Sequence, residues 1–249
     1  MVNTGYSNQM IKIGIIIFPG TNCDLDVFHV LTNVLNVDVK FIWHTKDKLG
    51  SFDALIIPGG FAFGDRLRAG VIAAHSPIIS DVKRVGLDGT PILGICNGFQ
   101  ILLECGLLPG ALIVNKPSDF LCKWVTLKVL NNKTPFTNQF KINNKVYLPI
   151  AHGEGRYVAD QETMRELQKK NRIVLKYFND NPNGSFSSIA GICNDYGNIL
   201  GIMPHPERAS EKILVPNKEA NDGLLIFESL LSYIEKSTPI LKIGAILRG

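Results

Sequence analysis

Cys96 has the sequence surroundings of a nucleophile. An apolar run typical of a buried strand, 91–95, leads directly into it, and a helix-like stretch, 99–104, follows. Gly94 and Gly98 stand two residues to either side, where a sharp strand-to-helix turn leaves little room for side chains. The dipole at the N-terminus of such a helix favours a thiolate over a thiol. The pattern predicts a nucleophile elbow that carries a cysteine, although this string alone is also compatible with a buried structural cysteine.

His205 and Glu207 are the candidates for the base and its orienting partner, both of which a cysteine nucleophile needs. Pro206 follows His205 and pushes its backbone toward an extended conformation. In an extended segment, residues i and i+2 point to the same side, so the Glu207 carboxylate can approach the imidazole and fix its tautomer. A strand exit with a surface histidine and glutamate is the alternative, and this segment alone does not decide between the two.

Two backbone positions are candidates for an oxyanion hole, because acyl transfer places negative charge on a carbonyl oxygen. One is the N–H of Asn97, directly after the nucleophile. The other is the Gly59-Gly60 turn, since glycine lets a backbone N–H approach closely; a plain turn after a strand is the alternative. No Lys-Ser/Thr pair follows these glycines and the chain has no G-x-G-x-x-G, so we expect no nucleotide site on it.

Size and composition place the 249-residue chain among ordinary globular proteins. Its net charge of +4, from 26 basic and 22 acidic residues, is too small to indicate nucleic-acid binding. The five cysteines form no C-x-x-C pair and the five histidines show no metal-ligand spacing, so we expect a cytoplasmic location, no disulfides and no metal site. The apolar run Ile13–Phe18 is too short for a membrane span or a signal sequence, so no membrane association is expected.

Strands and helices alternate over the first part of the chain, which predicts an α/β fold with a doubly wound, mostly parallel sheet and helices on both faces. Ligands bind such sheets beyond the C-terminal ends of the strands, where Gly60 and Cys96 both fall. The expected strands are Lys12–Phe18, Val39–Trp43, Asp53–Ile57 and Pro91–Ile95, and the expected helical stretches are 24–35 and 67–85, the second with a break at Pro77.

The pattern changes after Gly110. Further strands are expected over 122–129, 146–151, 173–178, 189–193 and 199–203, and helices over 164–170 and 222–235. The sequence leaves open whether residues 110–200 extend the main sheet or form a separate flap. No linker or repeat is visible, so we expect a single domain over residues 1–249 with tails at 1–9 and 237–249. We expect the tail 237–249 to pack along the surface; the alternative is that it docks on a partner.

Seven short segments of the chain resemble a known family. Three of them together are similar to the class I (triad-type) glutamine amidotransferases, whose domain has a flavodoxin-like fold. Four more resemble the glutaminase subunits of phosphoribosylformylglycinamidine synthases within that family, although Ala62-Phe63 replaces a Ser-Tyr pair that is usual there. The first three are Pro58–Gly60, Gly94–Gln100 and Pro204–Glu207, and the other four are Phe18–Asp24, Gly59–Asp65, Ala151–Tyr157 and Asn181–Ser185.

The resemblance implies a role for each matched residue. The cysteine attacks the side-chain amide of L-glutamine and forms a γ-glutamyl thioester, the histidine moves protons, and the glutamate holds the histidine. Backbone donors stabilise the oxyanion, and further residues grip the backbone end of glutamine. The residues concerned are Cys96, His205 and Glu207 for catalysis, Gly60 and Asn97 for the oxyanion, and Gln100, Gly153 and Glu154 for glutamine.

The resemblance also implies partners. Ammonia passes to a large synthase subunit that binds ATP, Mg²⁺ and formylglycinamide ribonucleotide, and a small accessory subunit completes the complex; no cofactor is expected on this chain. One alternative is a triad glutaminase that serves another synthase. A second is a stand-alone γ-glutamyl hydrolase or cysteine peptidase on the same elbow, and a third is a non-catalytic scaffold or glutamine sensor.

Several other residues of chemical interest receive weaker assignments. No His-x-Glu stands near Cys23 in the sequence, so we expect a structural role for it. His152 can line the site. Asp65, Arg66 and Arg68 are surface charges or contacts with a partner, and we favour the partner contacts.

Overall fold

The computed structural model describes residues 11–216 and 221–246, with side chains up to residue 237. The strands of its main sheet are β1 (Lys12–Ile17), β2 (Asp38–Trp43), β3 (Ala54–Ile57), β4 (Ile92–Ile95), β6 (Leu121–Val129), β7 (Lys145–His152), β9 (Ile173–Tyr177), β10 (Ile189–Cys193) and β11 (Ile199–Ile202). They form one nine-stranded sheet in the order β2-β1-β3-β4-β11-β10-β9-β6-β7. A separate small sheet pairs β5 (Ala111–Ile113) with β8 (Arg156–Val158).

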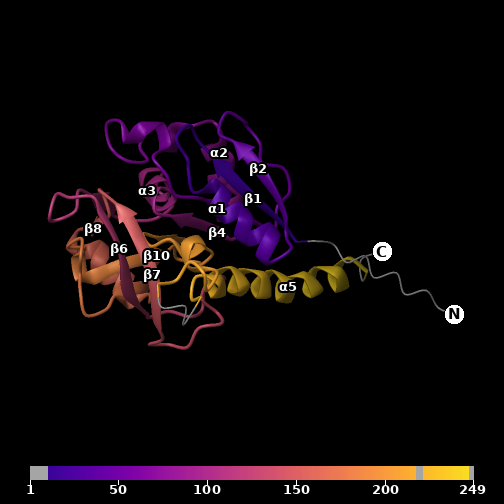
Figure 1. Ribbon diagram of the computed structural model, residues 1–249. Helices are drawn as coiled ribbons and strands as arrows, with labels where there is room; N and C mark the ends of the chain where they lie inside the picture. Colours follow the sequence, from indigo (N-terminus) through magenta and orange to yellow (C-terminus); the bar gives the residue numbers. More distant parts are fainter. Residues whose placement is uncertain (1–10, 217–220, 247–249) are drawn as a thin grey trace.

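The first half of the main sheet is parallel. β2, β1, β3, β4 and β11 pair in this way, and the inner strands are rich in isoleucine and buried along most of their length. Parallel strands of this kind need cover on both faces, which the helices supply (Figure 1). The helices are α1 (Asp24–His29), α2 (Ile78–Leu87), α3 (Asn97–Glu104), α4 (Gln161–Lys169) and α5 (Leu224–Ile246). The predicted doubly wound α/β fold of flavodoxin type is confirmed.

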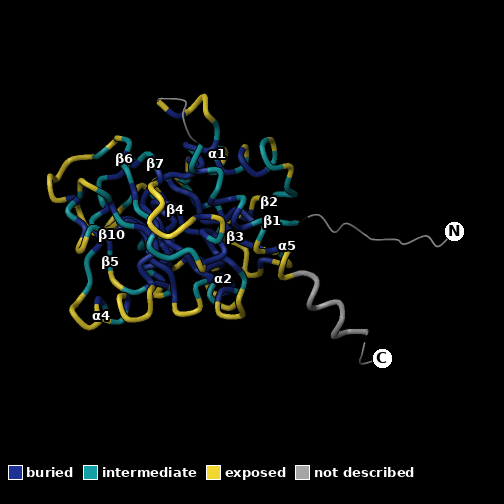
Figure 2. Tube along the Cα trace, turned by 90° about the horizontal axis from the view of Figure 1, so that it is seen from below, coloured by how far each residue is buried: buried dark blue, intermediate teal, exposed yellow. Residues whose placement is uncertain are grey.

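The second half of the sheet is antiparallel. β10 pairs with β11 and β9, and β6 pairs with β9 and β7. Residues 110–200 therefore extend the main sheet, and only the short β5–β8 pair stands apart from it. Buried apolar side chains from both halves, such as Ile56 and Leu148, belong to one cluster in the interior (Figure 2).

Some expected elements differ from the observed ones. Within the stretch 67–85, only the short turn Ala73–His75 and α2 are helical, because Gly70 adopts a φ of 82° and Pro77 interrupts the chain before α2. β5 and β8 have three residues each, which is too short for a periodic signal in the sequence.

The C-terminal helix is longer than predicted. α5 continues to Ile246 through most of the expected tail 237–249, because a proline removes one helical hydrogen bond without preventing the residues beyond it from staying helical. The side chains of this tail and the N-terminal tail 1–9 lie outside the described residues, so their predicted roles stay predictions. No helix in the described ranges combines the length and apolar character needed to cross a membrane.

Candidate active site

The order of three neighbouring strands assembles the site. β4 lies between β3 and β11, with Ile57 opposite Gly94 and Ile95 opposite Ile202. The N–H of Cys96 continues this pairing by donating to the carbonyl oxygen of Ile202 at 2.7 Å. The turn that follows β3 and the segment that follows β11 therefore emerge on opposite sides of the cysteine.

Cys96 sits at a strained turn. Its φ of 50° and ψ of −103° are unusual for a residue with a side chain, and α3 begins at the next residue. The flanking glycines are required for this turn. A Cβ on Gly94 would lie 2.7 Å from the carbonyl oxygen of Gly98, and one on Gly98 would overlap the carbonyl oxygen of Ile57. The structure thus has the predicted nucleophile-elbow geometry.

His205 and Glu207 form a buried pair. Their Nδ1 and Oε1 atoms are 2.6 Å apart, and each residue is only 2% exposed. The backbone N–H of His205 donates to the carbonyl oxygen of Pro149 in β7 at 2.9 Å, which fixes the segment beside the sheet. Burial alone would lower the pKa of His205, but the charges of Glu207 and Cys96 outweigh it and raise this pKa well above its usual range. An imidazole that holds its proton can stabilise a neighbouring thiolate.

Gly59 is the point where the cysteine and the histidine meet. A Cβ placed there would lie 2.7 Å from Cε1 of His205 and 3.4 Å from Cβ of Cys96. The Cys96 sulfur, in a residue that is 5% exposed, lies 3.7 Å from the carbonyl oxygen of Ala151 at the end of β7. The structure therefore brings together Cys96, His205 and Glu207 as the sequence predicts, while their catalytic roles stay proposals.

The two predicted oxyanion donors lie at the same end of the sheet. Asn97 is the first residue of α3, where a backbone N–H has no intrahelical acceptor. Gly60 adopts a φ of 145° and follows β3 closely. The Asn97 side chain links the two regions, because its Oδ1 accepts from the N–H of Ala62 at 3.0 Å. The amide thus holds the glycine-rich loop against the elbow.

The residues expected to bind glutamine form a connected group. Gln100 accepts from Nδ2 of Asn97 at 2.8 Å and donates to the backbone oxygen of Glu154 at 2.7 Å. Its amide is therefore largely engaged in positioning the loop 153–154. The carbonyl oxygen of Gly153 accepts from the N–H of Asn115 at 2.9 Å, and this bond anchors the loop from the other side.

Asp65 belongs to the site as well. Its Oδ1 lies 3.4 Å from Nδ2 of Asn97, and burial together with the nearby Glu154 carboxylate raises the pKa of Asp65 to about 6. Two carboxylates close enough to repel each other disfavour the state in which both are ionised. Sequence reasoning gave Asp65 a surface or partner role because nothing local connects it with residue 154.

His152 lines the site in its neutral form. Burial and the positive charge of His205 lower the pKa of His152 to about 4. Its Nδ1 is 3.1 Å from Oδ1 of Asn115, which orients the ring.

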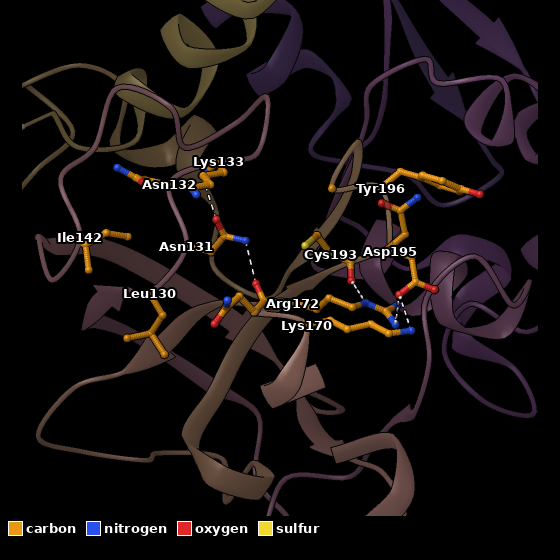
Figure 3. A pocket seen from close by; sticks show the side chains of 13 residues that line it. Leu130, Asn131, Asn132, Lys133, Ile142, Lys170, Arg172, Cys193, Asp195 and Tyr196 are labelled. Atoms are coloured by element: carbon orange, nitrogen blue, oxygen red, sulfur yellow. Dashed lines mark hydrogen bonds and ion pairs between the residues drawn. The ribbon is translucent and has the colours of Figure 1, made fainter. Parts of the chain in front are cut away.

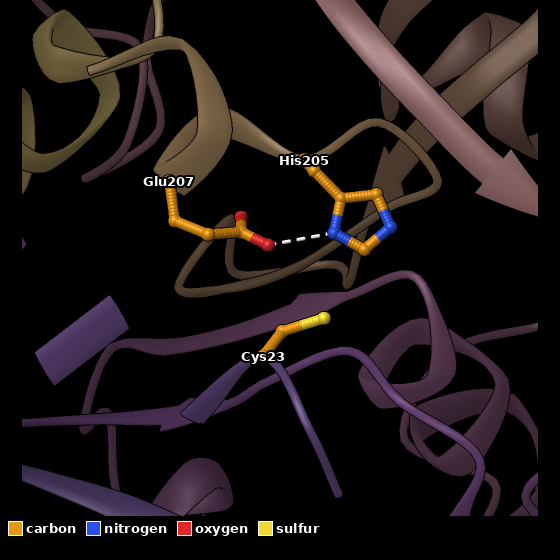
Figure 4. A group of neighbouring side chains, drawn as sticks. All are labelled: Cys23, His205 and Glu207. Carbon is orange, nitrogen blue, oxygen red and sulfur yellow. Dashed lines mark hydrogen bonds and ion pairs between the residues drawn. The ribbon is translucent and has the colours of Figure 1, made fainter. Parts of the chain in front are cut away.

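Cys23 is the residue that sequence reasoning placed least well. Its sulfur, an imidazole nitrogen of His205 and a carboxylate oxygen of Glu207 all lie within 4.8 Å of one another (Figure 4). The expected structural role of Cys23 stays a prediction, although a histidine and a carboxylate lie beside it in the fold. The histidine is remote in sequence, and only the fold brings it close.

The pocket drawn in Figure 3 is separate from the candidate active site. It lies beside β9 and β10 and is lined by residues such as Lys133, Lys170, Arg172 and Asp195. Arg172 donates to the carbonyl oxygen of Cys193 at 2.9 Å and pairs with Asp195 at 3.0 Å. Its lining contains none of the residues assigned to the candidate site.

Comparison with known proteins adds the family. Residues 10–234 match the CobB/CobQ-like glutamine amidotransferase domain. The chain belongs to the class I glutamine amidotransferases. It is 42% identical to a chain of the PurLQS structure from Thermotoga maritima, with a TM-score of 0.81 and coverage of 90% of this chain and 99% of that chain.

Two more distant solved structures share the fold. One, from Thermoplasma acidophilum, is described as part of a GMP synthase, and it has 19% identity and a TM-score of 0.62, covering 94% of this chain and 98% of that chain. The other is a glutamine amidotransferase from Thermotoga maritima, at 15% identity and a TM-score of 0.60, covering 90% and 98%. At this level of identity the likeness concerns the fold alone.

Proposed function

We propose that the chain is the glutaminase subunit of a phosphoribosylformylglycinamidine synthase, which supplies ammonia from L-glutamine to an ATP-dependent partner in purine biosynthesis. The observation that carries this proposal is the strained Cys96 beside a buried His205–Glu207 pair, in a chain 42% identical to one from PurLQS. This arrangement supports the proposal because acyl transfer needs a nucleophile, a base and a group that orients the base.

The reaction proceeds in two halves. The Cys96 sulfur attacks the side-chain carbonyl of glutamine, and the backbone N–H groups of Asn97 and Gly60 stabilise the oxyanion. His205 gives a proton to the departing nitrogen, so ammonia leaves and a γ-glutamyl thioester forms. His205 then takes a proton from water, whose oxygen attacks the thioester and releases glutamate. Glu207 keeps the imidazole in the orientation for both steps.

The carboxylates of Asp65 and Glu154 provide the place for the α-ammonium group of glutamine. Both are held in position, since Asn97 contacts Asp65 at 3.4 Å and the N–H of Ala69 donates to Glu154 at 3.4 Å. A bound ammonium relieves the repulsion between the carboxylates. Gln100 and Gly153 shape this subsite through the bonds that fix the loop around Glu154.

The partner subunits carry the rest of the chemistry. A large synthase subunit binds ATP, Mg²⁺ and the ribonucleotide, and a small accessory protein completes the complex, whereas this chain needs no cofactor. The reaction takes place in the cytoplasm, where five free cysteines stay reduced. Release of ammonia inside a closed complex keeps it unprotonated and away from water, so the isolated subunit is a poor glutaminase.

The test compares glutamine hydrolysis by wild type and Cys96→Ala, each alone and with the purified synthase and accessory subunits. We expect the partners to stimulate wild type strongly and the variant not at all, and mass analysis to find a glutamyl adduct on Cys96. Fast hydrolysis of γ-glutamyl peptides without partners would instead identify a stand-alone hydrolase. Stimulation by a different synthase would identify another member of the family.

A further inference from the structure

Cys23 is a buried thiol that the proposed reaction does not use. It is 2% exposed and precedes α1, and its N–H donates to the carbonyl oxygen of Gly59 at 3.2 Å. This bond ties Cys23 to the turn that also contacts His205. In Figure 4 its sulfur points toward the side of the site where the imidazole and the Glu207 carboxylate meet.

The three side chains are of types that bind metal ions in proteins. One sulfur, one imidazole nitrogen and one carboxylate oxygen lie within 4.8 Å of one another. Thiolate, imidazole and carboxylate are the ligands that Zn²⁺ prefers, with bonds of about 2.0–2.3 Å, so modest side-chain rotations bring all three onto one ion. Water or a fourth ligand completes a tetrahedral site.

Two atoms in this cluster lack partners. Nε2 of His205 and Oε2 of Glu207 are buried and have no hydrogen-bond partner among the described residues. Both residues are 98% buried, since each is 2% exposed. An unpaired buried polar atom is costly, and an ion that binds the Glu207 carboxylate satisfies Oε2 directly, whereas Nε2 of His205 points away from that carboxylate (Figure 4).

A cavity borders the cluster at Glu207. Its lining also includes Arg208, Asp26, His29 and Glu211. Nη2 of Arg208 lies 3.1 Å from the Cys23 sulfur, and Asp26 pairs with this guanidinium at 3.3 Å. When metal binds, Arg208 gives up its contact with the sulfur and keeps the one with Asp26.

We propose that Cys23, His205 and Glu207 bind a thiophilic divalent cation such as Zn²⁺, and that the bound ion blocks glutamine hydrolysis. The Cys23 thiol releases its proton to solvent when the metal–sulfur bond forms. The imidazole and the carboxylate that serve the reaction are then held by the ion. Inhibition rests on the proposed function, whereas metal binding stands without it.

The test measures binding in a chain that lacks the nucleophile. Cys96→Ala is titrated with Zn²⁺ by calorimetry and with Co²⁺ by absorption, where a thiolate ligand gives a charge-transfer band. We expect one site and a thiolate band. Adding Cys23→Ala or Cys23→Ser should weaken binding by about tenfold or more and remove the band. Adding Cys122→Ala, an exposed thiol that borders the same cavity, is the matched control and should change neither.

The outcomes separate the two proposals. If Cys96→Ala binds Zn²⁺ equally well with and without the added Cys23 substitution, the metal site is overturned. The same holds if the Cys96→Ala chain does not bind Zn²⁺, or if the added Cys122→Ala substitution removes binding. Melting curves show which variants are folded. If Cys23→Ala is not folded, Cys23→Ser is used in its place. In a second arm, Zn²⁺ should inhibit the glutaminase activity of wild type but not of Cys23→Ala. If wild type has no glutaminase activity, the Co²⁺ spectrum still decides the metal site.

Discussion

The contact between His205 and Glu207 controls which nitrogen of the imidazole is available. Nδ1 is held at 2.6 Å by a carboxylate that is itself buried, and the other ring nitrogen points away from Glu207 (Figure 4). A neutral amide in place of the carboxylate cannot stabilise a protonated imidazole. The charge of Glu207, more than its shape, is therefore what the reaction needs.

Replacing Glu207 by glutamine is expected to lower kcat by about 10²- to 10⁴-fold, because the proton transfers through His205 lose their electrostatic support. Glu211→Gln is the matched control, since that carboxylate is partly exposed and pairs with His29 at 2.8 Å. Glutamine hydrolysis by the complete complex measures both. A Glu207→Gln variant within twofold of wild type would remove this residue from the mechanism.

Asp65 is predicted to stabilise the bound substrate and to lower the stability of the folded chain. Its pKa is raised from 3.8 to about 6, so between these pH values the folded chain keeps a proton that the unfolded chain has lost. Stability contributed by Asp65 therefore falls as pH rises through this window, and the penalty is complete above it. Asp65→Asn should raise the free energy of unfolding at pH 7 by about 1–2 kcal/mol, allowing for partial exposure.

The same variant should bind glutamine less well. Loss of a charged acceptor for the α-ammonium group raises KM by about tenfold or more. Denaturant unfolding at pH 4 and pH 7, together with KM, measures the two opposite effects. The control is Asp88→Asn, at an exposed helix end where the carboxylate lies 3.3 Å from Arg84. An Asp65→Asn chain that is less stable at pH 7, or that keeps its KM, contradicts the assignment.

At the scale of elements, the approach of α3 to β3 depends on Gly98. A Cβ at this position overlaps the carbonyl oxygen of Ile57, so α3 must move away from the sheet. Gly98→Ala should destabilise the fold by about 1–3 kcal/mol and lower kcat, since Cys96 and Asn97 start the same helix. Melting curves and glutamine hydrolysis report the two effects.

Gly106→Ala is the control that separates stability from geometry. This glycine lies just beyond α3 with a φ of 78° and open space around it, so alanine costs about 1 kcal/mol through backbone strain alone. Its kcat should be unchanged. If Gly98→Ala keeps full activity as well, the position of α3 does not set that of the nucleophile.

Elements whose signal lies within one short stretch of sequence could be predicted. The runs that form β1, β3, β4 and β11 are apolar and punctuated by glycine or proline, and the elbow has its glycines at fixed offsets. The antiparallel strands could be predicted too, but not their place in the sheet, because pairing between distant strands leaves no local trace. β5 and β8 are too short to show a period.

In the candidate site, too, some contacts could be predicted from the sequence and others could not. His205 and Glu207 are two residues apart, so their contact follows from extended backbone. Cys23 and Asp65 reach the site from the segments that follow β1 and β3, and no spacing in the chain connects them with residues 205 and 154. Gln100 lies beside Asn97, but its bonds to Asn97 and Glu154 depend on a loop whose path the sequence does not give, and its role in binding glutamine stays a prediction.

For the whole molecule, we predict that the exposed aromatic rings beside the site contact the proposed synthase partner. Phe61 directly follows Gly60 and is 43% exposed, and Phe120 is 53% exposed with its ring centroid 6.3 Å from that of Phe61. Phe120 also lies next to Gly153, 3.8 Å from a Cβ built there. Aromatic side chains at the rim of a site contribute strongly to binding when a partner covers them.

Replacing both rings, as Phe61→Ala with Phe120→Ala, should weaken binding to the synthase by about 30-fold, equivalent to roughly 2 kcal/mol, because two hydrophobic contacts of the interface are lost. Stimulation of glutamine hydrolysis at limiting synthase should fall in proportion, while the low rate of the isolated chain stays unchanged. Tyr196→Ala is the control, because that ring is 79% exposed and borders the pocket of Figure 3. If the double variant binds like wild type, or if Tyr196→Ala is the weaker binder, the synthase docks on another face, and the rings beside Gly60 have a different role.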